Sequence, residues 1–152
     1  MDNKKTIDCA LLPYENQCFL LPTIAMEKAF LLEEYQIEEN MPAPFWFGTM
    51  QWDNASIPIV TMNLSAVSQY KQERPRVALV HALFSSDRFP PHFAILFDNK
   101  VQRVRIAPEE ITWADRENRT ILLEKGNEKR EVTVLDIYAL SQAVEQSLEV
   151  TR

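Results

Sequence analysis

Residues 45–62, FWFGTMQWDNASIPIVTM, carry the clearest structural signal in this chain of 152 residues. Phe45–Trp52 and Ser56–Met62 are rich in aromatic and β-branched residues, as expected of β-strands. Residues 53–55, Asp-Asn-Ala, lie between the two runs, and both Asp and Asn tolerate the positive φ angles of a tight turn. The segment therefore predicts a β-hairpin. Gly48 in its first strand permits a bulge or a close approach by another backbone.

Similar short runs of apolar and β-branched residues predict further strands along the chain. They are Cys18–Leu21, Val77–Phe84, His92–Phe97, Val101–Ile106, Thr120–Glu124 and Glu131–Leu135. Thr23–Leu32 fits a strand and a helical turn equally well. Near the end of the chain, apolar residues recur at spacings of three and four from Ile137 to Leu148, which predicts a helix with Asp136 as its N-cap.

These segments predict a mainly β architecture of roughly nine or ten short strands in two halves. The polar segment Ala66–Arg76, which contains Pro75, is predicted to connect the halves, so that they join near residues 66–76. The spacing of strands and turns favours barrels or a sandwich over a βαβ fold. A length of 152 residues indicates one domain that can bury a core of its own.

The composition excludes several classes of function. A net charge of -6 and a pI near 5.0 leave no general excess of Lys and Arg to neutralise phosphates, so we expect no nucleic-acid partner. No apolar run reaches the roughly 18 residues of a membrane span, and the N-terminus has no signal-peptide pattern. We therefore expect a cytoplasmic protein without direct membrane insertion. In that compartment Cys9 and Cys18 are expected to stay reduced.

No constellation for catalysis or metal binding is visible in the sequence. The two glycines, Gly48 and Gly126, cannot form a phosphate-cradling loop, and neither lies in a nucleophile elbow. His81 lies inside the apolar run VALVHALF and is expected to be a core or interface histidine, while His92 is expected to begin a strand. Glutamate pairs such as Glu109-Glu110 are expected to be solvated. We therefore expect no enzyme activity, no cofactor and no metal.

One resemblance covers most of residues 16–148. GTMQWDNASIPIVTM, residues 48–62, resembles in an ungapped register the signature hairpin of the CheW-like domain, G-V-x-N-L-R-G-x-x-x-P-V-x-D-L. Residues 94–98, 101–104 and 108–111 are similar to the family's G-L-L-V-D, V-x-E-V and P-P-E-x-I elements. Residues 134–140 resemble its closing L-L-D-L strand and the start of a C-terminal helix. The CheW-like domain is the coupling adaptor of bacterial chemosensory arrays.

The resemblance implies both a fold and a role. The family fold is two SH3-like five-stranded β-barrels packed together, with a groove between them and a C-terminal α-helix, and residues 1–152 would form a single such domain. The family role is that of a non-enzymatic scaffold. It couples the cytoplasmic tip of a methyl-accepting chemoreceptor to the regulatory domain of a chemotaxis-type histidine kinase.

The chain departs from the family pattern at the turn of the hairpin. Asp53 and Asn54 stand where the family usually has Arg-Gly, which inverts the charge of the turn, and Thr61 replaces the usual aspartate. With these changes the chain resembles divergent adaptors such as the ChpC-like group. That group belongs to the chemosensory system of type IV pili, which implies control of type IV pili and twitching motility.

Candidate partner-binding residues are expected on the two walls of the implied groove. One wall would hold Ile24, Met26 and Glu27, and the other Thr49, Gln51, Trp52, Asp53 and Asn54. Trp52 is the strongest candidate, because an indole N–H beside a polar turn needs a partner and tryptophan is enriched at interface hot spots. A receptor helix would offer apolar anchors to this groove at helical spacing.

Two alternative functions stay open at this level. A single-stranded nucleic-acid-binding barrel would stack bases on Trp46, Trp52 and Tyr35, beside the arginines at 74–76 or 103–105. A β-barrel metal-binding enzyme would need both histidines and Cys18 to converge.

Overall fold

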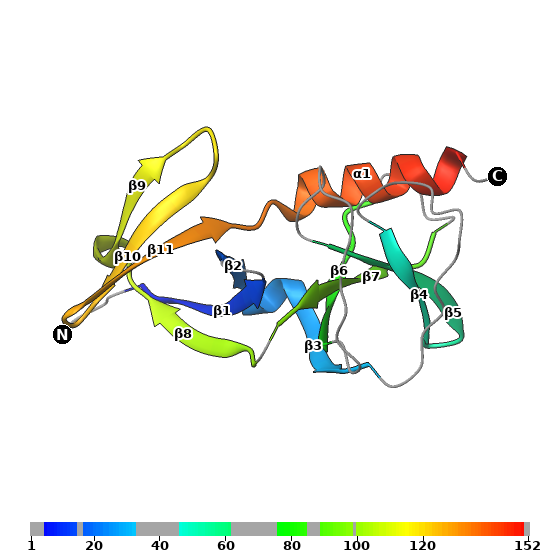
Figure 1. Cartoon of the computed structure of the whole chain (residues 1–152), viewed down its shortest axis with the longest axis horizontal. Helices are drawn as coiled ribbons and strands as arrows, with labels where there is room; N and C mark the ends of the chain where they lie inside the picture. The colour runs from blue at the N-terminus through cyan, green and yellow to red at the C-terminus, as the bar shows by residue number, and fades with distance from the viewer. Residues whose placement is uncertain are drawn as a thin grey trace. The chain divides into compact units, whose positions relative to one another are not determined.

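The computed structural model describes residues 5–14, 17–32, 46–61, 76–84, 89–98 and 100–150, apart from the side chains of residues 149 and 150. Within these residues it has eleven strands, two 3-10 helices and one α-helix (Figure 1), so the chain is mainly β, as the sequence predicts. The chain divides into two compact units, and each unit contains one sheet.

The first unit combines residues Met1–Ala25 with Asp98–Leu135. Its six strands are β1 (Ile7–Tyr14), β2 (Gln17–Pro22), β8 (Gln102–Ile106), β9 (Ile111–Asp115), β10 (Thr120–Lys125) and β11 (Glu128–Val134). They lie in the order β8-β1-β2-β11-β10-β9, and all neighbours are antiparallel except β2 and β11, which are parallel. The 3-10 helices η1 (Thr23–Ala25) and η2 (Pro108–Glu110) follow β2 and β8.

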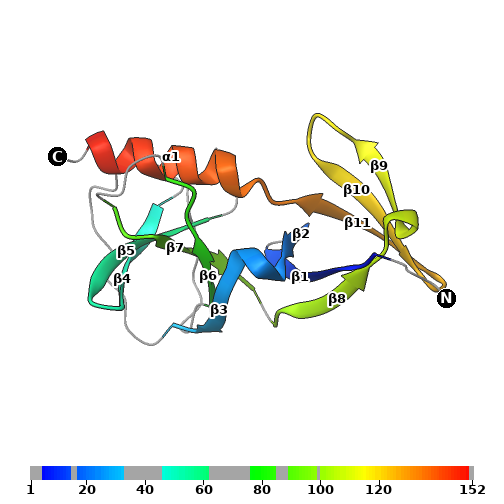
Figure 2. The same ribbon diagram turned by 180° about the vertical axis from the view of Figure 1, so that it is seen from behind.

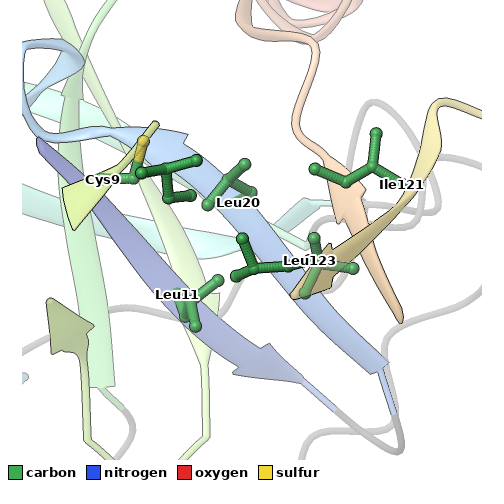
Figure 3. Close-up of a cluster of buried hydrophobic side chains, with 7 residues drawn as sticks. Cys9, Leu11, Leu20, Ile121 and Leu123 are labelled. Atoms are coloured by element: carbon green, nitrogen blue, oxygen red, sulfur yellow. The ribbon is translucent and has the colours of Figure 1, made fainter. Parts of the chain in front are cut away.

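Side chains from five of these strands form a buried cluster in the first unit (Figure 3). Its members are Cys9, Leu11, Leu20, Ile106, Ile121, Leu123 and Val132. Cys9 and Leu11 lie two residues apart on β1, as do Ile121 and Leu123 on β10, so each pair projects from the same face of its strand. Burial of this apolar surface holds strands from the start of the chain against strands that come much later.

The second unit combines Met26–Phe97 with Asp136–Arg152. Its elements are β3 (Met26–Leu31), β4 (Trp46–Trp52), β5 (Ala55–Val60), β6 (Arg76–His81), β7 (His92–Phe97) and α1 (Ile137–Val150). The strand order is β3-β6-β7-β5-β4, with β5 and β7 parallel and the other neighbours antiparallel. Helix α1 runs alongside this sheet, as both Figure 1 and the reverse view in Figure 2 show.

Strands β4 and β5 form the hairpin that the sequence predicts. Asp53 and Asn54 have φ angles of 51° and 63°, so both central residues of the turn are left-handed, as in the turns that suit the twist of a hairpin. The register shifts between Trp46 and Gly48, and this irregularity lies at the glycine that was expected to permit a bulge. The hairpin therefore has a tight turn at its tip and a register shift at its other end.

Other predicted elements are also confirmed. The ambiguous segment 23–32 contains both structures, since η1 is followed at once by β3. The hairpin of β10 and β11 turns at Gly126, whose φ angle is 62°. Helix α1 begins after Asp136, whose Oδ1 accepts a hydrogen bond of 3.0 Å from the N–H of Ala139, which is N-cap geometry.

The prediction of two five-stranded barrels needs correction. The first sheet has six strands, because β1 and β9 add to those that the sequence predicts. Strand β1 was missed because its sequence, IDCALLPY, has a charged residue at its second position and carries a proline, and β9 because all five of its residues are exposed. In the described residues the backbone pairing leaves both sheets open, with edges β8 and β9 in the first and β3 and β4 in the second.

The join near residues 66–76 is not where the units divide. The chain passes between units after Ala25, after Phe97 and after Leu135. Residues 66–75 lie outside the described part of the chain, and β5 and β6 on either side of them belong to the same unit. The reason is that β2 pairs with β11, which is distant in sequence, so the first unit is built from two separate segments.

Candidate functional site

Trp52, at the end of β4, packs against a side chain from the opposite edge of the second sheet. Its ring is stacked on that of Phe30 on β3, with centroids 5.9 Å apart and an interplanar angle of 22°. Lys28 Nζ lies over both rings, 5.4 Å from the centroid of Phe30 and 5.7 Å from that of Trp52. Edge strands β3 and β4 therefore meet through side chains. Trp52 is half-buried in this stack.

The turn beside Trp52 presents polar groups to solvent. Gln51, Asp53 and Asn54 are exposed, and Thr49 is half-buried. Both turn residues have left-handed backbone conformation, which defines the direction of the turn. The hairpin tip thus combines a packed aromatic residue with exposed polar residues.

The residues predicted for the other wall are divided between the two units. Ile24 lies in η1 of the first unit and is 87% exposed. Met26 and Glu27 begin β3 of the second unit, where Met26 is half-buried and Glu27 is exposed. A single exposed apolar residue is common on protein surfaces, so the exposure of Ile24 assigns it no role by itself. Glu27, in contrast, has specific neighbours.

Glu27 lies against two histidines that the sequence analysis did not group with it. His81 ends β6 and His92 begins β7, and the two are directly opposite in the antiparallel ladder, with ring centroids 5.0 Å apart. Glu27 Oε2 is 3.3 Å from Nε2 of His81 and 4.0 Å from Nε2 of His92. Three neighbouring strands therefore each contribute one polar side chain to a cluster, Glu27-His81-His92, at one end of the sheet.

The surroundings of His92 favour its neutral form. Burial lowers the pKa of His92, and the charge of His81 lowers it further, while Glu27 and Asp53 act in the opposite direction. The influence of Asp53 places the hairpin turn within electrostatic range of the cluster. The side chain of His92 is 17% exposed, and its Nε2 has no hydrogen-bond partner among the described residues. A neutral imidazole nitrogen of this kind can accept a hydrogen bond or bind a metal.

For His81 the core alternative is wrong and the interface alternative stays a prediction, whereas the expectation for His92 is confirmed. The side chain of His81 is 45% exposed, because it is the last residue of β6 and lies beyond the buried run Val77–Val80. It pairs with Glu27 and does not belong to the core. His92 is the first residue of β7, as expected from its position after two prolines.

The aromatic platform of the nucleic-acid alternative is not formed. Trp46 is only 6% exposed, so it cannot stack on a base, and Trp52 is already stacked on Phe30. Tyr35 lies outside the described residues. In the first unit, Nε of Arg105 is 3.0 Å from Asp8 Oδ1, so this arginine has an acidic partner.

That ion pair borders a pocket of about 340 Å³ in the first unit. The pocket is lined by Asp8, Cys9, Thr23, Arg103, Val104 and Arg105. The hydroxyl of Thr23 donates to the backbone oxygen of Asp8, which ties η1 to β1 at this place. Asp8, Thr23 and Arg105 of this lining therefore have partners within the first unit.

Cys18 does not join the two histidines as the metal-enzyme alternative requires. It packs against the buried cluster of the first unit, whereas the histidines belong to the second unit and have Glu27 as their neighbour. Cys9 and Cys18 are both free, as the sequence predicts. Burial raises the pKa of both thiols; the charge of Asp8 adds to the effect at Cys9, and that of Arg130 opposes it at Cys18.

The pair Glu109-Glu110 is not simply solvated. Glu110 accepts a hydrogen bond of 2.8 Å from the N–H of Ala107, and its Oε2 lies 3.2 Å from Lys125 Nζ. These contacts fix η2 against the tip of β10. Glu110 therefore has a structural role in the first unit, which sequence proximity to another glutamate did not indicate.

The chain matches known proteins by structure and not by sequence. No family model matches the sequence, and no curated protein matches it. Among solved structures, the chain is similar to the crystal structure of the scaffolding protein TtCheW from Thermoanaerobacter tengcongensis, with 13% sequence identity, a TM-score of 0.64, and coverage of 90% of this chain and 92% of that chain. The chain has a CheW-like fold. The low identity is consistent with the absence of any match at the level of sequence.

Within the CheW-like fold, the signature hairpin of the sequence is β4 and β5. The positions that agree with the family pattern in apolar character, such as Pro58 and Ile59, are buried, whereas the departures Gln51, Asp53 and Asn54 are exposed. Departures from the pattern thus lie at the exposed hairpin tip, and one further departure, Thr61, is buried. Among the described residues, no helix is long and apolar enough to cross a membrane.

Proposed function

We propose that this chain is a non-enzymatic scaffold of bacterial chemosensory signal transduction. It couples the cytoplasmic tip of a methyl-accepting chemoreceptor to the regulatory domain of a chemotaxis-type histidine kinase. The observation that carries the proposal is the CheW-like fold, which extends over 90% of the chain and is shared with a structure described as a scaffolding protein. A scaffold works through binding surfaces and needs no catalytic group.

The binding surface in this proposal is centred on the tip of the β4–β5 hairpin. Trp52 is the anchor, because the stack with Phe30 and Lys28 already fixes its rotamer, and a preorganised side chain loses less entropy on binding. Asp53 follows Trp52 in the chain and adds negative charge, and Asp53 and Glu27 both act electrostatically on His92. A partner that fits this surface presents an apolar pocket with basic groups at its edge.

The remaining candidate residues have supporting places in this proposal. Thr49, Gln51 and Asn54 form the polar rim of the hairpin, and Met26 lies at the start of β3. Ile24 supplies a separate apolar contact from the first unit. Rim residues contribute to water exclusion and specificity more than to affinity, so their single substitutions have small effects.

The acidic turn supports a specialised adaptor. Asp53 stands where the family usually has an arginine, so the charge that a partner meets at this turn is reversed. Reversal of a rim charge changes partner choice through repulsion of the wrong partner. This supports assignment to a divergent adaptor of the ChpC-like kind, which acts in the cytoplasm in the control of type IV pili and twitching motility.

The test is a binding measurement with the kinase regulatory domain and the receptor tip of the same organism. Trp52→Ala is expected to weaken kinase binding by about 30-fold, which corresponds to a hot spot of about 2 kcal/mol. Asp53→Arg is expected to weaken it as well, because it places positive charge against a basic partner. Titration calorimetry of each variant against the same partner measures both effects.

A matched control tests whether a loss of binding is specific to the β4–β5 hairpin. Glu128→Arg makes the same charge change at the exposed tip of the β10–β11 hairpin in the first unit and is expected to bind as the unchanged chain does. Circular dichroism establishes that each variant is folded. A folded chain that binds neither kinase nor receptor contradicts the adaptor function. Binding that survives both hairpin substitutions keeps the function but rejects this surface.

A further inference from the structure

Glu27 also belongs to the surface proposed for partner binding, but the two histidines beside it have no part in that proposal. The pairing of the strands specifies where all three residues lie. The antiparallel register places His81 opposite His92, so both side chains lie on the same face of the sheet. On the neighbouring strand β3, the register shifts between Met26 and Lys28, which makes Glu27 the extra residue of a bulge. Bulges re-aim side chains, and this one accompanies the approach of the Glu27 carboxylate to the two imidazoles.

The distances within the cluster are close to those of a metal site. Metal–nitrogen and metal–oxygen bonds of about 2.0–2.2 Å in tetrahedral geometry put ligand atoms roughly 3.3–3.6 Å apart. Glu27 Oε2 is 3.3 Å from His81 Nε2 and 4.0 Å from His92 Nε2, and one ligand atom from each residue lies within 4.8 Å of the others. Small side-chain rotations are sufficient to bring all three to bonding distance, since Glu27 and His81 are exposed.

His92 is also placed to bind a cation. Its Nε2 is shielded from solvent and has no hydrogen-bond partner in the described residues, although it points into a group of two other potential ligands. Two imidazoles and one carboxylate are a suitable ligand set for zinc and its neighbours in the first transition series, whereas magnesium and calcium prefer oxygen ligands alone.

We propose that Glu27, His81 and His92 bind one divalent transition-metal ion of the zinc class, with one ligand atom from each residue. The set supplies three protein ligands, so a fourth position faces solvent on the exposed side of Glu27 and His81 and is available to water or to a side chain of a bound protein. This site shares Glu27 with the proposed partner-binding surface, but metal binding and the adaptor function can each be present without the other. A metal-free chain can still be a scaffold, and a metal-binding chain need not be one.

The experiment is a calorimetric titration of the chelator-treated chain with zinc, which measures the affinity and the number of ions bound. One ion is expected to bind per chain, and the thermal midpoint is expected to rise in zinc, since a ligand that binds only the folded state stabilises it. Glu27→Gln and His81→Asn are each expected to weaken zinc binding by at least tenfold. Both residues are exposed, so these variants avoid the risk that His92→Asn, in a more buried place, does not fold.

Two controls separate this site from adventitious binding. Glu124→Gln removes an exposed carboxylate of the first unit and is expected to leave zinc affinity unchanged. Cobalt in place of zinc reports ligand type, and a thiolate charge-transfer band would show binding through cysteine. The proposal is overturned if the unchanged chain binds no zinc, if Glu27→Gln and His81→Asn bind it as tightly as before, or if that cobalt band appears.

Discussion

Burial in the first unit sets the chemistry of two single residues, Cys9 and Cys18. The pKa of each thiol is raised above the ordinary value of 9.0, chiefly by burial, so folding favours the protonated form. The stability from this preference is fully present below the ordinary thiol pKa and is lost as pH rises through the higher pKa of the folded state. We therefore expect the free energy of unfolding to decrease in the alkaline range and both thiols to react slowly with iodoacetamide at neutral pH.

Urea denaturation at several pH values measures the first effect, and alkylation rates followed by mass spectrometry measure the second. Because Tyr and Lys also titrate at high pH, the comparison is with Cys18→Ser, whose alkaline loss of stability is expected to be smaller. Rapid alkylation of the folded chain, at the rate of a free cysteine, would contradict the prediction that folding protects both thiols.

The cluster of Glu27, His81 and His92 shows what sequence cannot reveal at the scale of residues. No second histidine lies near His81 along the chain, so the sequence gives no sign of the pair. In the structure the second histidine is opposite it on β7, and that contact depends on the register of the ladder. The approach of Glu27 depends in addition on a bulge in β3, which no residue pattern indicated.

At the scale of elements, the β4–β5 hairpin depends on a turn that few residues can form. Asn54 has a φ angle of 63°, where a β-branched side chain is strained but glycine is not. We expect Asn54→Val to lower the free energy of unfolding by about 1–2 kcal/mol, and Asn54→Gly to leave it unchanged or raise it by up to about 1 kcal/mol. Urea denaturation of the three chains at one pH measures both changes.

A valine elsewhere in the same hairpin provides the control. Ser56 is exposed on β5 in extended backbone, where valine is a favoured residue, so Ser56→Val is expected to retain full stability. If Asn54→Val is as stable as Ser56→Val, the turn does not have the left-handed conformation described here.

Elements with a local signal were the ones that the sequence predicted well. The β4–β5 turn, the Gly126 turn and the Asp136 cap each depend on a few adjacent residues, and each is present in the structure. Strand β9 has no such signal, because all its residues are exposed and its position depends on pairing with β10. Side-chain contacts in the candidate site followed the same rule: the hairpin turn beside Trp52 was predicted, whereas Lys28 and Phe30, which pack against Trp52, come from a strand that pairs with neither β4 nor β5. That the hairpin tip binds a partner stays a prediction.

At the scale of the whole molecule, neither unit is a continuous segment of the chain. The first takes strands from both sides of residues 26–97, and the second takes its helix from beyond residue 135. Sequence analysis placed one boundary in a polar segment, which is where a simple two-part chain would divide. The interleaving follows from pairings between distant strands, such as β2 with β11, which leave no compositional trace.

This interleaving leads to a prediction about fragments. Residues 26–97 contain every strand of the second sheet but lack α1, whose Leu140 and Val144 are 3% and 0% exposed. The helix also accepts a hydrogen bond of 3.0 Å at Ser141 Oγ from the N–H of Leu83. Loss of two buried aliphatic side chains costs about 3–6 kcal/mol, which is comparable with the whole stability of a domain.

We therefore expect residues 26–97 alone not to fold, and the same residues joined to 136–152 by a flexible Gly/Ser linker to fold. Near-ultraviolet circular dichroism and amide NMR dispersion distinguish the two results. Equal dispersion in both chains would mean that α1 is not needed to complete the second unit.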